Sequence, residues 1–302
     1  MTDRGSVPID PERGNIEPHE AFALLSDPNR FDIIATLAEA SREALPFNDL
    51  YERSTFEDSG QFNYHLDRLV GPFVRETDEG YGLRHAARLA YRLAVSGLLS
   101  DRGEAEITTL GTTCVRCETG ELAAVYEGDR FWVRCRDCGR RATVAPFPPR
   151  ALANHDPDRA PAAFDRYTLG SVVRASENVC PWCASRLSAS LEPADDGWPA
   201  VDWVIRRGCD HCQGWIHTRV HDLVRLHPAV IAFYHDRGVD ALGWSFWAAE
   251  RAMADRTTVD ADADGWAATV TLARDDGALT LGLAADLRVS TTEVVARETE
   301  GR

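Results

Sequence analysis

Apolar residues in the first third of the chain recur every three or four positions, which predicts a series of amphipathic helices. Asp27-Pro28 indicates a helix start, because aspartate caps a helix and proline fits its first turn. Ser59 is expected to cap a later helix. Five helices are expected, with these apolar residues in order: Ala21, Phe22, Leu24 and Leu25; Phe31, Ile33, Ile34 and Leu37; Phe47, Leu50 and Tyr51; Phe62, Leu66, Leu69 and Val70; Ala86, Ala90, Leu93 and Gly97.

A strand-like segment follows the fourth of these helices. Phe73–Arg75 and Tyr81–Leu83 flank the turn sequence Asp78-Glu79-Gly80, which predicts a β-hairpin. Four helices, a hairpin and a closing helix over residues 84–99 are the element order of a winged helix-turn-helix. We therefore expect a winged helix-turn-helix over residues 18–100, after a mobile tail over residues 1–17.

The fourth helix carries a polar stripe that points away from its apolar stripe. In the major groove, glutamine pairs with adenine and arginine with guanine, while tyrosine and histidine reach phosphates. Arginines at the two ends of the hairpin are candidates for contacts with the DNA backbone or minor groove. The alternative is a simple solvated helix face. The DNA-binding residues predicted from this pattern are Ser59, Gln61, Tyr64, His65, Arg68, Arg75 and Arg84.

All eight cysteines of the chain stand in C-x-x-C pairs. Each pair supplies half of a tetrahedral metal shell, and the pairs group by spacing into two sets of four. A closed four-cysteine shell stabilises structure and leaves no open position for catalysis. Two structural Zn²⁺ ions are expected, although iron in a rubredoxin-like site uses the same pairs. The two predicted ligand sets are Cys114, Cys117, Cys135 and Cys138, then Cys180, Cys183, Cys209 and Cys212.

The segments between the paired cysteines predict hairpins, so each set reads as a zinc ribbon. Leu122–Val125 and Phe131–Val133 flank Glu127-Gly128-Asp129, and a second hairpin turns at Asp195-Asp196-Gly197. Ribbon 1 is expected over residues 109–148, a connecting helix over 160–175 and ribbon 2 over 176–218. Disulfides and a redox dithiol at Cys180 and Cys183 are weaker alternatives, because the chain shows no signal peptide and no βαβ context.

Two features of the ribbons have open interpretations. The arginines of ribbon 1 are either a second nucleic-acid contact or ordinary exposed cations: Arg116, Arg130, Arg134, Arg136, Arg140 and Arg141. The tryptophans of ribbon 2 are expected to form its core, with an aromatic binding face as the alternative: Trp182, Trp198, Trp203 and Trp215.

Residues 222–302 predict a small α+β domain. Two helices are expected over His227–Arg237 and Trp244–Ala254. Three strands follow over Trp266–Ala273, Ala278–Ala284 and Leu287–Val295, with a turn at residues 275–277. The whole chain is therefore expected to be a multidomain α+β protein. This last domain is a candidate site for a small-molecule effector, but its residues name no ligand.

The composition indicates a soluble protein adapted to high salt. The net charge is −15, and all 33 basic residues are arginine. An acidic, lysine-free surface is typical of a protein adapted to molar salt, where charge is screened within about 3 Å. The acidity is therefore a weak argument against nucleic acid. No run of apolar residues is long enough to span a membrane, so we expect no membrane contact and a cytoplasmic location.

The N-terminal third resembles the ArsR-type winged-helix regulators. The resemblance rests on Leu25-Ser-Asp-Pro-Asn-Arg30, the helix Phe31–Ala38, and the stretch Phe62-Asn-Tyr-His-Leu-Asp-Arg-Leu69. It implies a homodimer that binds double-stranded DNA, with the 84–99 helix in the dimer interface. It places Gln61, Asn63, Tyr64, His65 and Arg68 at DNA-facing positions. Because no cysteine precedes Cys114, metal-responsive derepression is not expected. The full domain arrangement is similar to regulators of halophilic archaea.

Two functions of different class follow from these patterns. The chain has no G-x-S-x-G, Walker, H-E-x-x-H or G-x-G-x-x-G motif, and its cysteines are committed to metal, so we expect no enzyme activity. The first hypothesis is a homodimeric transcriptional regulator that binds specific DNA sequences. The alternative is an interaction or scaffold protein that uses the winged helix and ribbons to bind transcription machinery.

Overall fold

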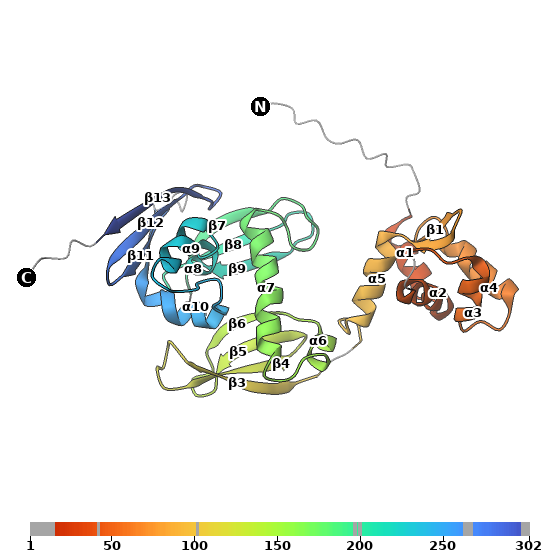
Figure 1. Cartoon of the computed structure of the whole chain (residues 1–302), viewed down its shortest axis with the longest axis horizontal. Helices are drawn as coiled ribbons and strands as arrows, with labels where there is room; N and C mark the ends of the chain where they lie inside the picture. The colour runs from red at the N-terminus through yellow and green to blue at the C-terminus, as the bar shows by residue number, and fades with distance from the viewer. Residues whose placement is uncertain are drawn as a thin grey trace, which may run out of the picture. The chain divides into compact units, whose positions relative to one another are not determined.

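A computed structural model describes residues 16–40, 43–100, 103–195, 198, 201–261 and 268–296. The chain divides into two compact units, residues 1–101 and 102–302 (Figure 1). Most of the predicted tail (residues 1–17), part of the 195–197 turn and the start of the strand predicted from Trp266 lie outside the described residues. Helices and strands both occur, so the expectation of a mixed α+β protein is confirmed.

Unit 1 contains the helices and the hairpin that its apolar pattern predicts. Asp27 caps the second helix, where its Oδ1 accepts hydrogen bonds from the N–H groups of Asn29 and Arg30. Arg30 in turn donates to the carbonyl oxygens of Ala23 and Leu24 at the end of the first helix. The elements are α1 (Pro18–Leu25), α2 (Pro28–Glu39), α3 (Phe47–Arg53), α4 (Ser59–Leu69), β1 (Val74–Thr77), β2 (Gly80–Leu83) and α5 (His85–Val95).

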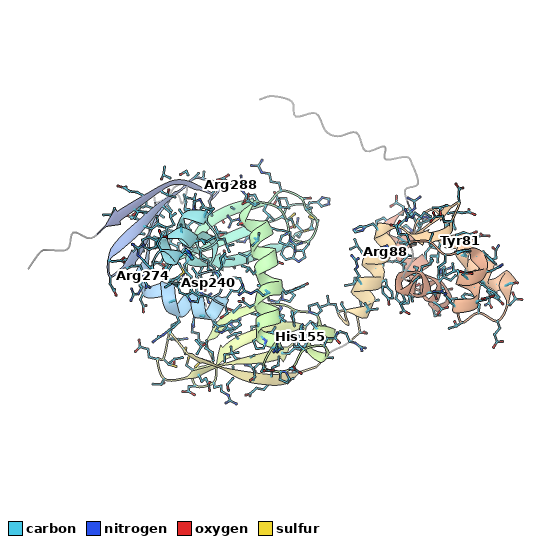
Figure 2. All side chains as sticks on the ribbon, viewed as in Figure 1. Tyr81, Arg88, His155, Asp240, Arg274 and Arg288 are labelled. Atoms are coloured by element: carbon cyan, nitrogen blue, oxygen red, sulfur yellow. The ribbon has the colours of Figure 1, made fainter. Side chains whose placement is uncertain are left out.

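The hairpin of unit 1 gains a short third strand segment that the sequence pattern did not indicate. Leu45 and Tyr81 exchange two backbone hydrogen bonds of 2.8 and 2.9 Å. Tyr81 also donates from its hydroxyl to Glu76 across the hairpin, and Figure 2 labels its position. The core of the unit is built from residues of all its helices and the hairpin, with Ile33, Ile34, Phe62 and Leu66 fully buried.

Unit 2 contains three antiparallel sheets and five helices among its described residues. The first sheet has the order β3-β4-β5-β6, the second β7-β8-β9 and the third β10-β11-β12-β13. The strands are β3 (Ala105–Thr113), β4 (Glu121–Glu127), β5 (Arg130–Cys135), β6 (Arg141–Pro146), β7 (Ser188–Pro193), β8 (Trp203–Gly208), β9 (Trp215–Arg219), β10 (Thr257–Ala261), β11 (Ala268–Arg274), β12 (Gly277–Leu283) and β13 (Val289–Ala296). The helices are α6 (Pro149–Ala153), α7 (Ala160–Ser176), α8 (Val220–Val224), α9 (Pro228–His235) and α10 (Phe246–Met253), which a short 3₁₀ turn, η1 (Ala254–Arg256), extends.

Helix α7 packs against both the first and the second sheet of unit 2 (Figure 1). Its N-terminal half packs against the first sheet, where the rings of Phe131 and Phe164 stack with centroids 4.3 Å apart. Its C-terminal end reaches the second sheet, where Ala175 packs near the second cysteine set. Arg288, labelled in Figure 2, further ties the turn before β13 to Glu177 at the end of α7.

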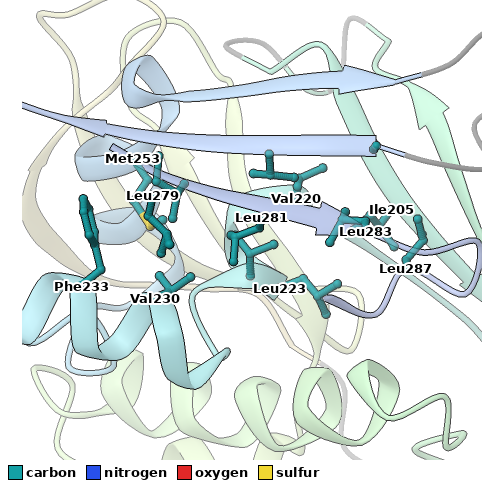
Figure 3. Packing of buried hydrophobic residues seen from close by; sticks show 14 of the residues in the cluster. Ile205, Val220, Leu223, Val230, Phe233, Met253, Leu279, Leu281, Leu283 and Leu287 are labelled. Carbon is teal, nitrogen blue, oxygen red and sulfur yellow. The ribbon is translucent and has the colours of Figure 1, made fainter. Parts of the chain in front are cut away.

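The predicted ribbons and C-terminal domain do not form separate domains. One apolar core contains Ile205 of β8, Val230 and Phe233 of α9, and Leu279 and Leu281 of β12 (Figure 3). The boundary expected between ribbon 2 at residue 218 and a domain from residue 222 is therefore wrong. The physical reason is that a three-stranded ribbon has one apolar face, and here that face is buried by α8, α9 and the third sheet.

No helix among the described residues is long and apolar enough to cross a membrane.

Candidate metal centres and nucleic-acid interface

The four cysteine pairs adopt one repeated turn. In each turn the first cysteine accepts a backbone hydrogen bond, at its carbonyl oxygen, from the residue that follows the second cysteine. That following residue has a left-handed backbone in all four turns, with φ between 57° and 68°. Only one of these four residues is glycine, so the sequence indicated the left-handed turn only at Gly139. The residues are Glu118, Gly139, Ala184 and Gln213.

The turns bring the predicted cysteine sets together in the predicted groups. The four Sγ atoms of each set lie within 4.8 Å of one another. Sγ–Sγ distances are 3.8 Å for Cys114–Cys138 and 3.7 Å for Cys117–Cys135. The corresponding distances in the second set are 3.6 Å for Cys180–Cys212 and 3.5 Å for Cys183–Cys209.

These distances fit a tetrahedral metal ion. Metal–sulfur bonds of about 2.3 Å at tetrahedral angles separate the sulfur atoms by roughly 3.8 Å. Backbone N–H groups also point at the sulfurs, with Arg116 N and Gly120 N each 3.4 Å from a ligand Sγ in the first set. The two cysteine sets can therefore each hold one metal ion.

One thiol in each set ionises readily. Backbone hydrogen bonds from Thr119 and Gly120 lower the pKa of Cys117 to about 6. Hydrogen bonds from the Ser185 side chain and backbone lower the pKa of Cys183 to about 6. Burial raises the pKa of Cys135 to about 11. Because a metal binds the thiolate, these backbone and side-chain hydrogen bonds favour metal binding at Cys117 and Cys183.

Most residues of the predicted α4 stripe lie on the surface of unit 1. Gln61, Asn63, Tyr64 and Arg68 are exposed, and Tyr64 is 59% exposed. Asn63 donates a hydrogen bond from Nδ2 to Asp67 one turn later. The opposite side of the helix is buried in the core. The helix thus presents amide, phenol and guanidinium groups on one solvent face.

Two of the predictions for α4 are wrong. His65 is only 7% exposed, because its ring packs against Phe56 and its Nδ1 lies 3.7 Å from Asp27 Oδ1. It therefore supports the start of α2 and does not face solvent. The N-cap of α4 is Asp58, whose side chain accepts from Gln61 N, and not Ser59, which is the first residue of the helix.

The two hairpin arginines have different surroundings. Arg84 is exposed just before α5. Arg75 on β1 is half-buried and lies 3.7 Å from the carboxylate of Glu43. Arg84 is therefore the freer of the two to reach a partner.

Most arginines of ribbon 1 have partners inside the protein. Arg134 and Arg136 pair with Glu127 and Glu106, and Arg141 lies over the ring of Trp132. Arg140 is buried and pairs with Glu250 of α10. This pairing weakens the interpretation of the arginine-rich stretch as a nucleic-acid contact.

Arg140 belongs to a buried charge network that the sequence did not reveal. Glu250 also binds Arg219 at 2.9 Å, and Arg219 binds Asp222 at 3.0 Å. Arg219 donates a further hydrogen bond to the carbonyl oxygen of Ala142 on β6. All four charged side chains are at most 4% exposed. The network joins the first sheet to the second sheet and α10.

His217 and His221 stand four residues apart, and the structure does not combine them into a metal site. Both residues are at least partly buried, but no metal-ligand group among the described residues includes either. Burial lowers the pKa of His217 and lowers that of His221 to about 4. Both rings are therefore neutral at pH 7.

Two family models match the chain, one in each unit. A domain of unknown function, DUF7351, matches residues 111–289, which is more than half of the chain, so the chain belongs to this family. A second domain of unknown function, DUF7347, matches residues 18–94. No curated protein and no solved structure matches the chain.

Proposed function

We propose that the protein is a homodimeric transcriptional regulator that binds specific sequences of double-stranded DNA. Unit 1 is a winged helix-turn-helix of the ArsR type in this proposal, and α4 is its recognition helix. Each four-cysteine centre in unit 2 holds a structural Zn²⁺. The proposed role is not enzymatic, and it places the protein with DNA in the cytoplasm.

The exposed face of α4 carries the proposal. Gln61, Tyr64 and Arg68 follow one another at helical spacing on the solvent side, while Phe62, Leu66 and Leu69 anchor the other side in the core. Glutamine and arginine are the side chains suited to bidentate contacts with adenine and guanine. Asn63 lies beside them, and Ser59 stands at the helix start, where its hydroxyl is suited to a phosphate.

The hairpin after α4 supports a second contact. β1 and β2 form a short antiparallel pair of four residues each, which is the size of a wing. Arg84 follows β2 on the surface, and Arg75 lies on β1. Both are proposed to touch the DNA backbone or minor groove, with Arg75 exchanging its contact with Glu43 for one with phosphate.

Exposed apolar residues on α5 support the proposed dimer. Leu89 and Leu93 are 51% and 42% exposed on successive turns, while Ala87 and Tyr91 face the core of unit 1. Phe22 on α1 is 74% exposed. Large apolar side chains at helical spacing on one surface are typical of a buried helix–helix contact.

Zinc is proposed over iron for both centres. The all-cysteine donor sets, in each of which two of the four cysteines are buried, suit a structural Zn²⁺. Metal analysis of protein purified without added iron tests this directly. We expect two zinc ions per chain, and a red rubredoxin-like absorption would overturn the assignment.

Selection of genomic fragments by the full-length protein at roughly 1 M KCl tests the DNA-binding proposal, because affinity depends on salt. We expect an enriched inverted repeat with half-sites about one helical turn apart. Gln61→Ala and Arg68→Ala are each expected to lower affinity by about 1–3 kcal/mol. Arg251→Ala, an exposed arginine on α10, serves as the matched control and should bind as the wild type does.

The double variant Leu89→Glu/Leu93→Glu tests the dimer by light scattering and should be monomeric. Absence of any enriched sequence, with both metal centres loaded, would instead favour the alternative of a protein-interaction module. One observation favours that alternative: Asp58 at the N-cap of α4 and Asp67 on α4 are exposed, and carboxylates repel phosphate.

A further inference from the structure

Two tryptophans that the sequence pattern assigns to the core of ribbon 2 lie on its surface. Trp182 is 55% exposed and Trp215 is 54% exposed. Trp182 lies close against Gly214, where a Cβ atom would come within 2.5 Å of the indole ring. Trp203 alone of these tryptophans packs against the large core of unit 2. Exposed indoles on a rigid, metal-stabilised element are typical of a binding surface.

Trp215 belongs to an open half of the second sheet. Its register partner on β8 is Gly208, and the next outward pair is Arg206 opposite His217. The side chains of Ile205 and Ile216 point to the other side, into the apolar clusters of unit 2. We call the outward group the Trp215 face; it consists of Ser188, Ser190, Arg206, Gly208, Trp215 and His217.

The shape of the Trp215 face leaves an aromatic ring accessible on one side. Because Gly208 has no side chain, the surface beside the Trp215 ring is open in the direction of β8. On the other side the His217 ring lies 4.9 Å from the indole, centroid to centroid. Farther along, Val204 and Arg219 are buried, so the face is closed at that end. A planar group can therefore stack near Trp215 without moving the backbone.

The chemistry of the face favours nucleic-acid bases over a protein partner. The face offers aromatic rings, a guanidinium and hydroxyl groups, and none of its described residues is aliphatic. Protein interfaces have an apolar centre, whereas unpaired bases need only π surfaces and a cation near the phosphate. The His217 ring also lies 6.4 Å from the Trp198 ring, centroid to centroid, and burial lowers its pKa, so it adds no charge to the face at neutral pH.

Hydrogen-bond acceptors at the border of the face favour RNA over DNA. Glu192, on the same side of β7, accepts a hydrogen bond from the Ser190 hydroxyl at 2.8 Å. Its carboxylate has further lone pairs, which suit the 2′-hydroxyl donor of a ribose, a group that the deoxyribose of DNA lacks.

We propose that the Trp215 face binds single-stranded RNA, with an unpaired base stacked on Trp215 and Arg206 at the adjacent phosphate. This site lies in unit 2 and does not depend on DNA recognition by α4. A protein with both activities would contact its operator through unit 1 and a transcript through unit 2.

Fluorescence anisotropy of a labelled uridine oligomer of about 12 nucleotides, titrated with the full-length, metal-loaded protein at roughly 1 M KCl, tests the site. Trp215→Ala should weaken binding roughly tenfold, which is the loss expected for one stacked base. Trp215→Phe should retain most of the affinity, because it keeps an aromatic ring. Arg206→Gln should weaken binding and reduce its salt dependence. Metal content and melting temperature of each variant establish that it is folded.

Two controls separate this site from other surfaces. Tyr167→Ala removes another exposed aromatic side chain, on α7, and should leave RNA affinity unchanged. Arg68→Ala, which disables the proposed DNA contact, should also leave it unchanged. Loss of RNA binding in Arg68→Ala would overturn the proposal, because it would place the contact on α4. Equal affinity of Trp215→Ala and wild type would overturn it as well, and equal binding of a thymidine DNA oligomer would overturn the assignment to RNA.

Discussion

Ala184 has the same left-handed backbone, at φ 59°, that Gly139 has at φ 68°. An L side chain in this region costs on the order of 1 kcal/mol, whereas glycine adopts it freely. Ala184→Gly is therefore expected to raise the free energy of unfolding by about 0.5–1 kcal/mol. The greater conformational entropy that glycine gives to the unfolded chain reduces this gain. Urea denaturation of the metal-loaded protein measures the change.

Gly139→Ala, the reverse substitution at the equivalent turn position, is the control for that prediction. It introduces a Cβ atom at the equivalent position of another cysteine turn and should lower stability by a similar amount. A gain in stability for both variants, or a loss for both, would show that backbone strain in the turns does not control stability.

His221 makes the stability of unit 2 depend on pH. It is fully buried, and desolvation lowers its pKa to about 4 despite the nearby Asp222 carboxylate, while Arg219 and Arg225 also lower it. Above the unfolded pKa of about 6.5 the ring is neutral in both states and contributes no pH dependence. Below that pH only the unfolded state takes up the proton, so the fold loses stability as pH falls.

This difference predicts a loss of about 2 kcal/mol between pH 7 and pH 5. His221→Gln cannot take up the proton and should lose this part of the pH dependence. Equilibrium denaturation of both proteins across the range gives the contribution as a difference, in which protonation of the cysteine ligands cancels. Parallel pH profiles for the two proteins would contradict the prediction.

Some site residues can be predicted from the sequence, and others cannot. All eight cysteines were predictable, because cysteine pairs at this spacing have few uses other than metal binding. The burial of His65 and Arg140 was not predictable, since a histidine or arginine is buried only where a partner from a distant element meets it. Asp27 is 38 residues from His65 in the sequence, and Glu250 is 110 residues from Arg140.

At the scale of elements, the clearest target is the charge network that joins the first two sheets of unit 2 to α10. Glu250 is the shared partner of Arg140 and Arg219, and its side chain is 1% exposed. Glu250→Gln leaves the buried Arg140 guanidinium facing a neutral amide, while Arg219 keeps Asp222 as its partner. Because an unpaired buried charge is strongly unfavourable, we expect a loss of about 3–5 kcal/mol in the free energy of unfolding. Chemical denaturation monitored by tryptophan fluorescence measures this loss.

An exposed ion pair provides the matched control. Glu177→Gln removes the partner of Arg288, where both side chains are more than half exposed. Such a pair is worth about 0–1 kcal/mol, so this variant should be close to wild type. If Glu250→Gln lowered the free energy of unfolding as little as Glu177→Gln, water would have to reach the charge network. The contact between the two sheets would then be open to solvent.

Elements with a periodic pattern were predictable, and short or irregular ones were not. The helices of unit 1 and α7 lie within a few residues of their expected positions, because their apolar residues repeat at helical spacing. β10 was missed, since Thr257–Ala261 contains only one large apolar residue, Val259, which packs at the border of the core. The absence of a boundary near residue 220 was also missed, because sequence patterns show which faces are apolar but not which faces meet.

At the scale of the whole molecule, the cysteine sets lie entirely within unit 2. Unit 1 has its own core and contains no cysteine. In unit 2, Cys114 and Cys135 belong to one apolar cluster and Cys180 and Cys209 to another. Metal binding is therefore expected to stabilise unit 2 and to have no effect on the intrinsic stability of unit 1.

The tryptophans make this prediction measurable in the intact chain. All eight tryptophans lie after residue 130, so tryptophan fluorescence reports on unit 2 alone, while far-ultraviolet circular dichroism also reports on the helices of unit 1. A zinc chelator should lower the fluorescence-detected melting temperature by at least about 10 °C, because structural zinc contributes several kcal/mol and each kcal/mol moves the midpoint by about 2–4 °C. The circular dichroism melt should then separate into two steps, with the unit 1 step unchanged and both restored by added Zn²⁺. A single step that shifts as a whole would mean that the two units unfold together, so that metal binding in unit 2 would also stabilise unit 1.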